Sequence, residues 1–562
     1  MRTGWDQEVD LLVVGSGGGG MTAALVAKHK GLDVLVIEKT EFFGGSTARS
    51  GGGLWIPNNY LLERDGIDDS FEMARQYMQH TVGERVAQKL QDAYLTHSPR
   101  MIIWLRDNTC VQFQRTPGYA DYYPERPGGV AASRSLEPVP FNGKKLGADL
   151  AYLRKPMAEA PGGLAFTASE YQKIGMLTST WTGKKTAINA ALLWIRNLLT
   201  GVRCLTMGQA LSARLRFAMQ QANIPLWLNT VFQELIVEDE RVVGIVAQKE
   251  GRSIRILARK GVILADGGFP HNLEMRKKYL PEPTSTQWTV ASTGNTGDAI
   301  QAGIQLGAAT DLMDDAWWGP SSRPPNEEPF FHVGERGYPG GLMVNGAGQR
   351  FVNESAPYID VVHSMYSQHS EETPHIPAYF IFDQRYRNKY IFGLFFPMLP
   401  IPRRYFENGY IYRAATIASL AHQIGIDEET LASTVERFNQ FAYNGKDLDF
   451  GRGESAYDNY YGDPTIRPNP NLAALQKPPF YAIKMWPGDL GTKGGLVTDE
   501  WARVMRPDST TIEGLYAVGN SMSSVMGNSY PGAGATIGPA MTFGYLAAHH
   551  VAGDWLSNPS NL

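Results

Sequence analysis

The sequence predicts an α/β protein, and three observations lead to this fold class. An apolar, strand-like segment at residues 9–14 runs directly into the glycine-rich stretch GSGGGG. A second apolar segment, at residues 34–37, ends in Glu38. Between about residues 311 and 486 the chain is richer in proline, polar loops and aromatic clusters. We therefore expect a Rossmann-like domain built from both chain ends, with an inserted α+β domain that caps it.

The first strand and its glycines form a dinucleotide-binding motif. Gly15, Gly17 and Gly20 fit the pattern GxGxxG, in which the glycines allow a tight turn, a close approach to a pyrophosphate and helix–strand packing. The N-terminus of the following helix offers free N–H groups to the phosphates. Glu38 lies roughly 20 residues further on, where an acid accepts hydrogen bonds from a ribose. The alternative is a glycine-rich loop that binds no ligand.

The segment after Glu38 narrows the nucleotide to a flavin. KTEFFGGSTARSGGGLWIPNN is dense in Gly, Ser and Thr, and it resembles the second nucleotide-contact loop of the succinate dehydrogenase and fumarate reductase flavoproteins. RKGVILADGGF, STGNTGDAIQAG and GLYAVGN fit that superfamily in the same order. Members with covalent flavin carry a histidine in the loop, whereas this chain has Ala48, Arg49 and Ser50 there. The resemblance implies FAD that is not covalently bound.

The expected FAD contacts lie in six segments of the chain. They are Gly15, Ser16, Gly17, Gly20, Glu38, Lys39, Gly45, Ser46, Thr47, Ser50, Gly51, Gly52, Ala265, Gly267, Asp298, Gly519, Asn520, Ala535 and Ile537. Asp266 replaces the small residue or threonine expected in the ADGG stretch, and a carboxylate there would alter the flavin potential.

The length of 562 residues favours more than one domain. We expect residues 1–310 and 487–562 to form the FAD-binding domain and residues 311–486 to form the catalytic domain. Within the latter, residues 427–443 show a helical pattern.

Composition excludes several classes of protein. The net charge of −4 gives no reason to expect a nucleic-acid partner. The two cysteines, Cys110 and Cys204, have no CxxC spacing, so we expect neither a metal site nor a disulfide framework. No apolar run reaches the roughly 18 residues that a membrane span needs. We expect a cytoplasmic protein.

Residues 171–233 contain no Asp or Glu but several basic residues, interspersed with AALLWIRNLL. A basic amphipathic surface can bind the anionic inner face of a membrane. The alternative is a helical layer packed on the FAD domain. The basic residues are Lys184, Lys185, Arg196, Arg203, Arg214 and Arg216.

Tyrosines cluster in the informative loops. GYADYYPERPGG supplies Tyr119, Tyr122 and Tyr123, GQRFVNESAPYIDV supplies Tyr358, and NSYPGAGATIGPAM supplies Tyr530. A phenol with a pKa near 10 is a weak base at neutral pH unless the substrate proton is already acidic. Protons next to a ketone meet this condition when donors hold the enolate oxygen. Ordinary packing is the alternative for Tyr119 and Tyr123.

A more specific resemblance covers residues 8–552. GSTARSGGG, GYADYYPE, MDDAWWGP, RFVNESAPY, RGESAYDNYYGDP, PGDLGTKGG and NSYPGAGATIGPAMTFGY resemble the 3-ketosteroid Δ1-dehydrogenases. That family oxidises the C1–C2 bond of a 3-oxosteroid and passes hydride to FAD. The resemblance implies that Tyr530 and the Gly534 N–H bind the 3-keto oxygen and that Tyr358 takes the C2 proton. Tyr122 would assist Tyr358, with Tyr123 as the alternative.

The remaining expectations concern substrate, electron acceptor and rival functions. We expect Phe331, Tyr119 and Tyr123 to line the steroid site, with domain packing as the alternative for the phenylalanine. A single dinucleotide motif indicates an external quinone-like electron acceptor. Rival readings are a 3-oxo-5α-steroid 4-dehydrogenase, a flavin electron carrier, and a fumarate-reductase-like enzyme with Arg403 and Arg404 as carboxylate ligands.

Overall fold

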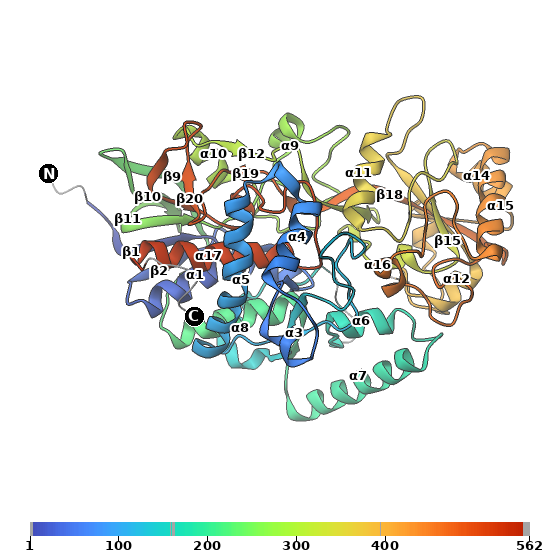
Figure 1. The fold of residues 1–562 in the computed structure, drawn as a ribbon, viewed down its shortest axis with the longest axis horizontal. Coiled ribbons are helices and arrows are strands. Elements are labelled where there is room, and N and C mark those ends of the chain that lie inside the picture. Colours follow the sequence, from blue (N-terminus) through green and yellow to red (C-terminus); the bar gives the residue numbers. More distant parts are fainter. Residues whose placement is uncertain (1–3, 158, 160–162, 394, 555–562) are drawn as a thin grey trace.

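Two large sheets organise the chain, one at each end of the long axis of the molecule (Figure 1). The computed structural model describes residues 4–157, 159, 163–393 and 395–554. Helices and strands are mixed along the sequence, which confirms the predicted α/β content.

The larger sheet draws its strands from both ends of the sequence. Its order is β20-β21-β10-β11-β1-β2-β8, and β9 pairs with β10. Strands β21, β11, β1, β2 and β8 run parallel to one another, and the apolar ends of β1, β2 and β11 are buried, as is typical of parallel strands. The strands are β1 (Gln7–Val14), β2 (Val34–Ile37), β8 (Leu226–Trp227), β9 (Thr230–Glu238), β10 (Arg241–Lys249), β11 (Arg252–Leu264), β20 (Arg503–Met505) and β21 (Thr511–Ala517).

Helices α1 (Gly18–His29) and α17 (Ile537–Val551) pack against each other beside this sheet. Small residues allow this close contact, since a side chain at Gly19 would collide with Ala540 and one at Gly544 with Gly19. The first helix and the last helix of the described chain therefore share one core with β1 and β11.

The second sheet is antiparallel and has the order β14-β13-β18-β16-β15, with β17 on β18. Helix α11 (Tyr358–Ser367) packs on β13, and α14 (Ile417–Ile424) and α15 (Glu428–Asn444) cover the other strands. The helix predicted at residues 427–443 is confirmed, with Asp427 as its N-cap. The strands are β13 (Ala316–Ser322), β14 (Phe330–Phe331), β15 (Gly341–Val344), β16 (Ala378–Asp383), β17 (Ile411–Ala414) and β18 (Phe480–Thr492).

The remaining helices and short strands complete the fold around the two sheets. The helices are α2 (Gly45–Arg49), α3 (Tyr60–Arg64), α4 (Phe71–Thr81), α5 (Gln88–Asn108), α6 (Ala168–Ile174), α7 (Trp181–Thr200), α8 (Met207–Gln221), α9 (Leu273–Tyr279), α10 (Asp298–Gln305), α12 (Gln384–Lys389), α13 (Arg404–Glu407) and α16 (Ala456–Tyr460). The short strands are β3 (Leu54–Trp55), β4 (Phe113–Arg115), β5 (Ser135–Pro138), β6 (Phe141–Asn142), β7 (Cys204–Leu205), β12 (Thr310–Asp311) and β19 (Gly495–Leu496). No helix in the described ranges is both long enough and apolar enough to cross a bilayer.

A buried ion cluster anchors the loop that carries the first group of tyrosines. Arg134 contacts Asp69 at 2.6 Å and Asp121 at 2.8 Å, and all three side chains are almost fully buried. Asp121 also accepts a hydrogen bond of 2.7 Å from the Trp55 indole. Because buried charges are stable only when they are paired and hydrogen-bonded, this cluster fixes residues 119–123 against β3.

Candidate active site

One cavity of about 810 Å³ extends from the glycine-rich loop after β1 to the tyrosine cluster. This volume lies within the range typical of sites for cofactors and small molecules. The cavity is lined by every residue that the sequence suggested for cofactor, substrate or catalysis, except Ala535 and Tyr123. Ala535 is buried in the core, and Tyr123 points its hydroxyl at Asp360, 2.9 Å away.

The glycine-rich loop has the shape that a dinucleotide needs. Gly15 has a φ of +109°, and a side chain there would collide with the backbone of Ala265. Gly17 is the N-cap of α1, so the first turn of the helix lies at the cavity wall, where the Gly18 N–H donates to the Thr47 hydroxyl at 3.0 Å. The Glu38 carboxylate, at the end of β2, accepts a hydrogen bond of 2.6 Å from the Ser16 hydroxyl.

A second set of contacts ties the loop after Glu38 to the start of α10. The Lys39 ammonium lies 2.7 Å from the Asp298 carboxylate, and Ser46 donates to Asn295 at 3.0 Å. Asp266 is held by the Ser521 hydroxyl at 2.8 Å and by the Ala299 N–H at 3.1 Å. Burial raises the pKa of Asp266 to about 6, although these two hydrogen bonds oppose the shift. The carboxylate is thus an internal link between the segment after β21 and α10.

Three tyrosines from distant parts of the sequence meet at the other end of the cavity. The Tyr122 hydroxyl donates to the Tyr358 hydroxyl at 2.8 Å. The Tyr530 ring lies 5.0 Å from the Tyr122 ring and 5.3 Å from the Tyr358 ring, measured between centroids. Tyr358 is the first residue of α11, so the second sheet positions it, whereas Tyr530 follows the strands of the larger sheet.

Burial controls the protonation of these phenols. It raises the pKa of Tyr122 and Tyr358 well above the ordinary value of 10, and that of Tyr530 less strongly. Neighbouring tyrosines add to the shift of Tyr358, whereas the hydrogen bond from Tyr122 lowers its pKa. All three side chains are therefore neutral at neutral pH, and a phenolate at Tyr358 depends on the donor at Tyr122.

The hydrogen bonds continue outward from Tyr122. Its hydroxyl lies 3.5 Å from that of Tyr119, which in turn accepts a hydrogen bond of 2.8 Å from Tyr461. The Phe331 ring, from β14, packs edge-on against Tyr358 with centroids 5.3 Å apart. This end of the cavity is therefore aromatic and carries several phenol hydroxyls.

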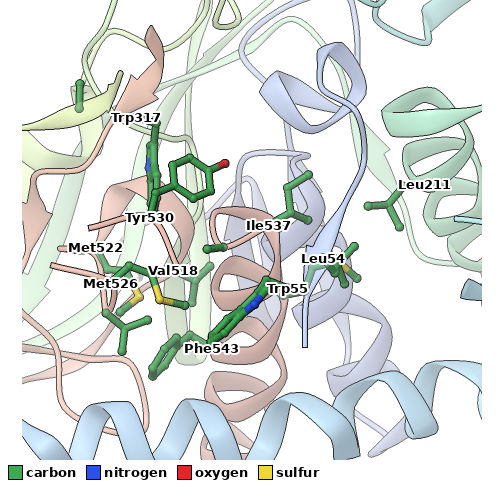
Figure 2. Close-up of a cluster of buried hydrophobic side chains, with 14 of the residues drawn as sticks. Leu54, Trp55, Leu211, Trp317, Val518, Met522, Met526, Tyr530, Ile537 and Phe543 are labelled. Atoms are coloured by element: carbon green, nitrogen blue, oxygen red, sulfur yellow. The ribbon is translucent and has the colours of Figure 1, made fainter. Parts of the chain in front are cut away.

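The loop that carries Tyr530 continues into α17 through Gly534. Gly534 has a φ of +98°, and a side chain there would collide with the backbone of Gly53 and Leu54. The Tyr530 hydroxyl lies 3.2 Å from the Thr536 hydroxyl. Figure 2 shows Tyr530 beside Trp317 in the buried cluster, and the two ring centroids are 4.8 Å apart.

Some residues at the cavity were not predicted from the sequence. Thr536 lies in NSYPGAGATIGPAM and Asn295 lies in STGNTGDAIQAG. Both segments carry the family resemblance, so the sequence could have indicated these two residues. Tyr461 also lies inside a recognised motif, RGESAYDNYYGDP, whereas Trp194 and Leu198 reach the cavity through tertiary packing that no local pattern indicates.

Comparison with known proteins identifies the family. A model of the FAD binding domain family matches residues 10–537. The chain is 49% identical to the 3-oxosteroid 1-dehydrogenase of Mycobacterium tuberculosis, over 97% of this chain and 98% of that protein. It is 35% identical to the 4-oxocyclohexanecarboxylate 2-dehydrogenase of Sinomonas cyclohexanicum, over 97% and 93%.

A solved structure agrees with these relatives. The 3-ketosteroid Δ1-dehydrogenase of Sterolibacterium denitrificans, in complex with 1,4-androstadiene-3,17-dione, superposes with a TM-score of 0.94 at 40% identity, over 97% of this chain and 100% of that chain. The chain therefore belongs to the FAD-binding flavoproteins and, within them, to the 3-oxosteroid 1-dehydrogenase family. Its cofactor is FAD, and the close-packed glycine loop and the helix terminus at the cavity wall fit this group.

The glycine loop gives a test of the cofactor site. Gly15→Ala should purify with at least about fivefold less FAD, because the new methyl group collides with backbone and such overpacking costs roughly 1–3 kcal/mol. Gly31→Ala is the matched control, since Gly31 has a φ of +84° but open space around it. Flavin absorbance per protein measures the outcome, and equal FAD content in both variants would contradict the assignment.

Proposed function

We propose that this protein dehydrogenates the C1–C2 bond of 3-oxosteroids, as part of steroid or sterol degradation. The observation that carries the proposal is the convergence of Tyr122, Tyr358 and Tyr530 in the cavity that also contains the FAD-binding loop. The relatives named for this reaction support the same conclusion.

Enolate chemistry explains the arrangement of the tyrosines. In this mechanism the Tyr530 hydroxyl and the Gly534 N–H donate to the 3-keto oxygen, which makes the C2 proton more acidic. Tyr358 takes that proton in its phenolate form and becomes a neutral phenol, and the hydrogen bond from Tyr122 stabilises the phenolate before the transfer. Bound FAD supplies the acceptor, at flavin N5, for the hydride that leaves C1. Tyr119, Phe331 and the rings around them form the apolar slot for the steroid.

The cofactor is held without a covalent bond in this proposal. No histidine is found among the described residues that line the cavity. An external quinone-like acceptor reoxidises the flavin, a proposal that depends on the single dinucleotide motif in the sequence.

The same proposal assigns roles to the two sheets. The larger sheet, with its parallel β1–α1–β2 unit, serves as a Rossmann-like FAD domain formed by residues 1–310 and 487–562. The second sheet serves as the catalytic cap, formed by residues 311–486. Strand β18 crosses the second boundary and ends at Thr492, so the two domains share one continuous strand.

Two rival functions lose support from the geometry. Arg403 and Arg404 are exposed and lie outside the cavity lining, so they offer no carboxylate clamp for a fumarate-like acid. A simple flavin electron carrier does not need three buried phenols beside the cofactor cavity. A 4-dehydrogenase of 5α-steroids would use a similar site, and its product distinguishes it.

We also propose that helix α7 attaches the protein to the anionic inner face of the membrane. Figure 1 shows α7 on the outside of the molecule, where it neighbours α6. Trp181 and Leu199 are each 84% exposed, and Ile188 and Leu192 are each 60% exposed. The spacing of these residues places them on one face of the helix.

Charge and position support this proposal. Lys184, Lys185 and Arg196 are exposed on α7, whereas Arg214 is buried and donates to backbone carbonyls. The other side of the helix reaches the active site, because Trp194 and Leu198 line the cavity. An apolar steroid could therefore pass from lipid to the cavity beneath α7, while the protein remains cytoplasmic.

The reaction itself can be measured directly. Anaerobic mixing with androst-4-ene-3,17-dione should bleach the flavin absorbance, and NMR of the product should show a C1–C2 alkene. A 5α-reduced steroid and 4-oxocyclohexanecarboxylate are the comparison substrates. A C4–C5 alkene from the 5α-steroid alone would indicate the 4-dehydrogenase, and failure of every ketone to bleach the flavin would refute the proposal.

The tyrosines have separable effects on turnover. Tyr358→Phe should retain FAD but lose turnover, whereas Tyr530→Phe should lower kcat by roughly 10²-fold, because Gly534 remains as a donor. In the wild type, kcat/KM should rise with pH above neutrality as Tyr358 ionises, and Tyr122→Phe should move this rise to higher pH. Tyr152→Phe, at a 45% exposed position, is the control. If Tyr358→Phe kept more than a tenth of the activity, Tyr358 would not be the base.

Membrane attachment can be tested by flotation with lipid vesicles. The wild type should float with phosphatidylglycerol vesicles more than with phosphatidylcholine vesicles, and Leu199→Ser should weaken binding by roughly tenfold, since burying a leucine contributes roughly 1.5–3 kcal/mol. Leu448→Ser is the matched control, because Leu448 is 69% exposed elsewhere on the protein. Failure of the wild type to float with either lipid would refute the proposal.

A further inference from the structure

The proposed mechanism leaves a buried ion pair behind Tyr530 unused. The Lys493 ammonium lies 3.6 Å from the Asp315 carboxylate, and their side chains are 0% and 4% exposed. Lys493 follows the end of β18, and Asp315 precedes β13. A buried ammonium is costly unless neighbouring groups compensate it, so its partners indicate what it stabilises.

Lys493 holds the backbone that leads into Tyr530. Its ammonium donates to the Gly527 carbonyl at 2.9 Å and to the Ser529 carbonyl at 2.6 Å. It also lies 4.6 Å from the centre of the Trp317 ring, which packs against Tyr530 (Figure 2). The lysine therefore supports Tyr530 both through the chain and through the neighbouring indole.

Asp315 connects the same segment to the helix of the proposed base. Its carboxylate accepts a hydrogen bond of 3.1 Å from the Asn528 amide and lies 3.0 Å from the His363 ring nitrogen. His363 belongs to α11, whose first residue is Tyr358. One carboxylate thus links the segment before Tyr530 to the helix that carries Tyr358.

We propose that Lys493 and Asp315 are positioning residues that set the separation between the Tyr530 and Tyr358 hydroxyls. The inference rests on the proposed function, in which these hydroxyls act on adjacent positions of one steroid ring. Proton removal at C2 requires the oxygen donor and the base to be in place together. A misplacement of about 1 Å can slow such a step by roughly 10²-fold.

The main test uses the FAD-loaded enzyme with Lys493→Met, which keeps the length of the side chain but removes its charge and donors. Turnover of androst-4-ene-3,17-dione should fall by roughly 10²-fold. The KM should stay within about twofold, since the apolar slot that provides most of the binding is unchanged. Deuterium at C2 should slow the variant more than the wild type, because proton removal becomes limiting. Lys89→Met is the control, since Lys89 is 62% exposed and pairs with Glu500.

Two milder variants keep the test decisive if Lys493→Met does not fold with FAD. Asn528→Ala and His363→Ala each remove one link to Asp315, at exposed or partly exposed side chains. Each should lower kcat and increase the C2 isotope effect without loss of flavin.

The outcomes separate this inference from the proposed function. A wild type that does not oxidise the steroid would refute the proposed function and the inference with it. An active wild type together with a fully active Lys493→Met would overturn the inference alone. If Lys493→Met cannot be loaded with FAD, wild-type kcat and isotope effects in both milder variants would likewise overturn it.

Discussion

The contact between the hydroxyls of Tyr122 and Tyr358 is the interaction on which the proposed active site depends. It joins two segments that are 236 residues apart in the sequence. The C-terminal loop is fixed to the same place, because the Pro531 carbonyl accepts hydrogen bonds from the Tyr122 N–H at 2.9 Å and the Tyr77 hydroxyl at 2.7 Å. Tyr530 precedes this proline, so the three phenols are held by one connected set of short contacts.

Burial orders the side chains of this cluster, but it also makes the ionisation of a phenol less favourable. Excluding water fixes the hydroxyls and strengthens their hydrogen bonds, but it also disfavours a charged phenolate. The surrounding phenols offer donors, and the Lys493–Asp315 pair places fixed charges behind the Tyr530 loop. The tyrosine end of the cavity therefore combines neutral phenols in the lining with a Lys493–Asp315 pair that lies outside the lining. This division suits an enolate reaction, in which charge must develop on the substrate oxygen and not on an unpaired side chain.

The sequence was most informative where function requires a local pattern. The strand, glycine turn and helix around Gly15 were predictable because the steric demands of a dinucleotide act over a few residues. The pairing of Tyr122 with Tyr358 was predictable only through family resemblance. Tyr122 and Tyr123 could not be separated from the sequence, because the choice depends on which hydroxyl faces α11 and which faces Asp360.

Features that arise from tertiary packing could not be predicted from the sequence. Ala535 fits the pattern of a cofactor-binding loop, yet the turn at Gly534 directs it into the core. The basic stretch at residues 171–233 divides in space, since Arg216 of α8 pairs with Asp149 while the basic residues of α7 remain exposed. No periodicity in the sequence distinguishes a helix that covers a sheet from one that lies outside it.

The use of both chain ends in the larger sheet has a consequence for biosynthesis. Strand β21 pairs with β11, and α17 packs on α1, so the last described segments complete a core that the first segments begin. During translation, the N-terminal strands leave the ribosome long before these partners exist, so their apolar faces stay uncovered until the partners are made. The cavity proposed for FAD, which includes Gly519 and Ile537, closes only when these residues have been made. Flavin would therefore stabilise only those chains in which both the N-terminal glycine loop and this later segment have been synthesised.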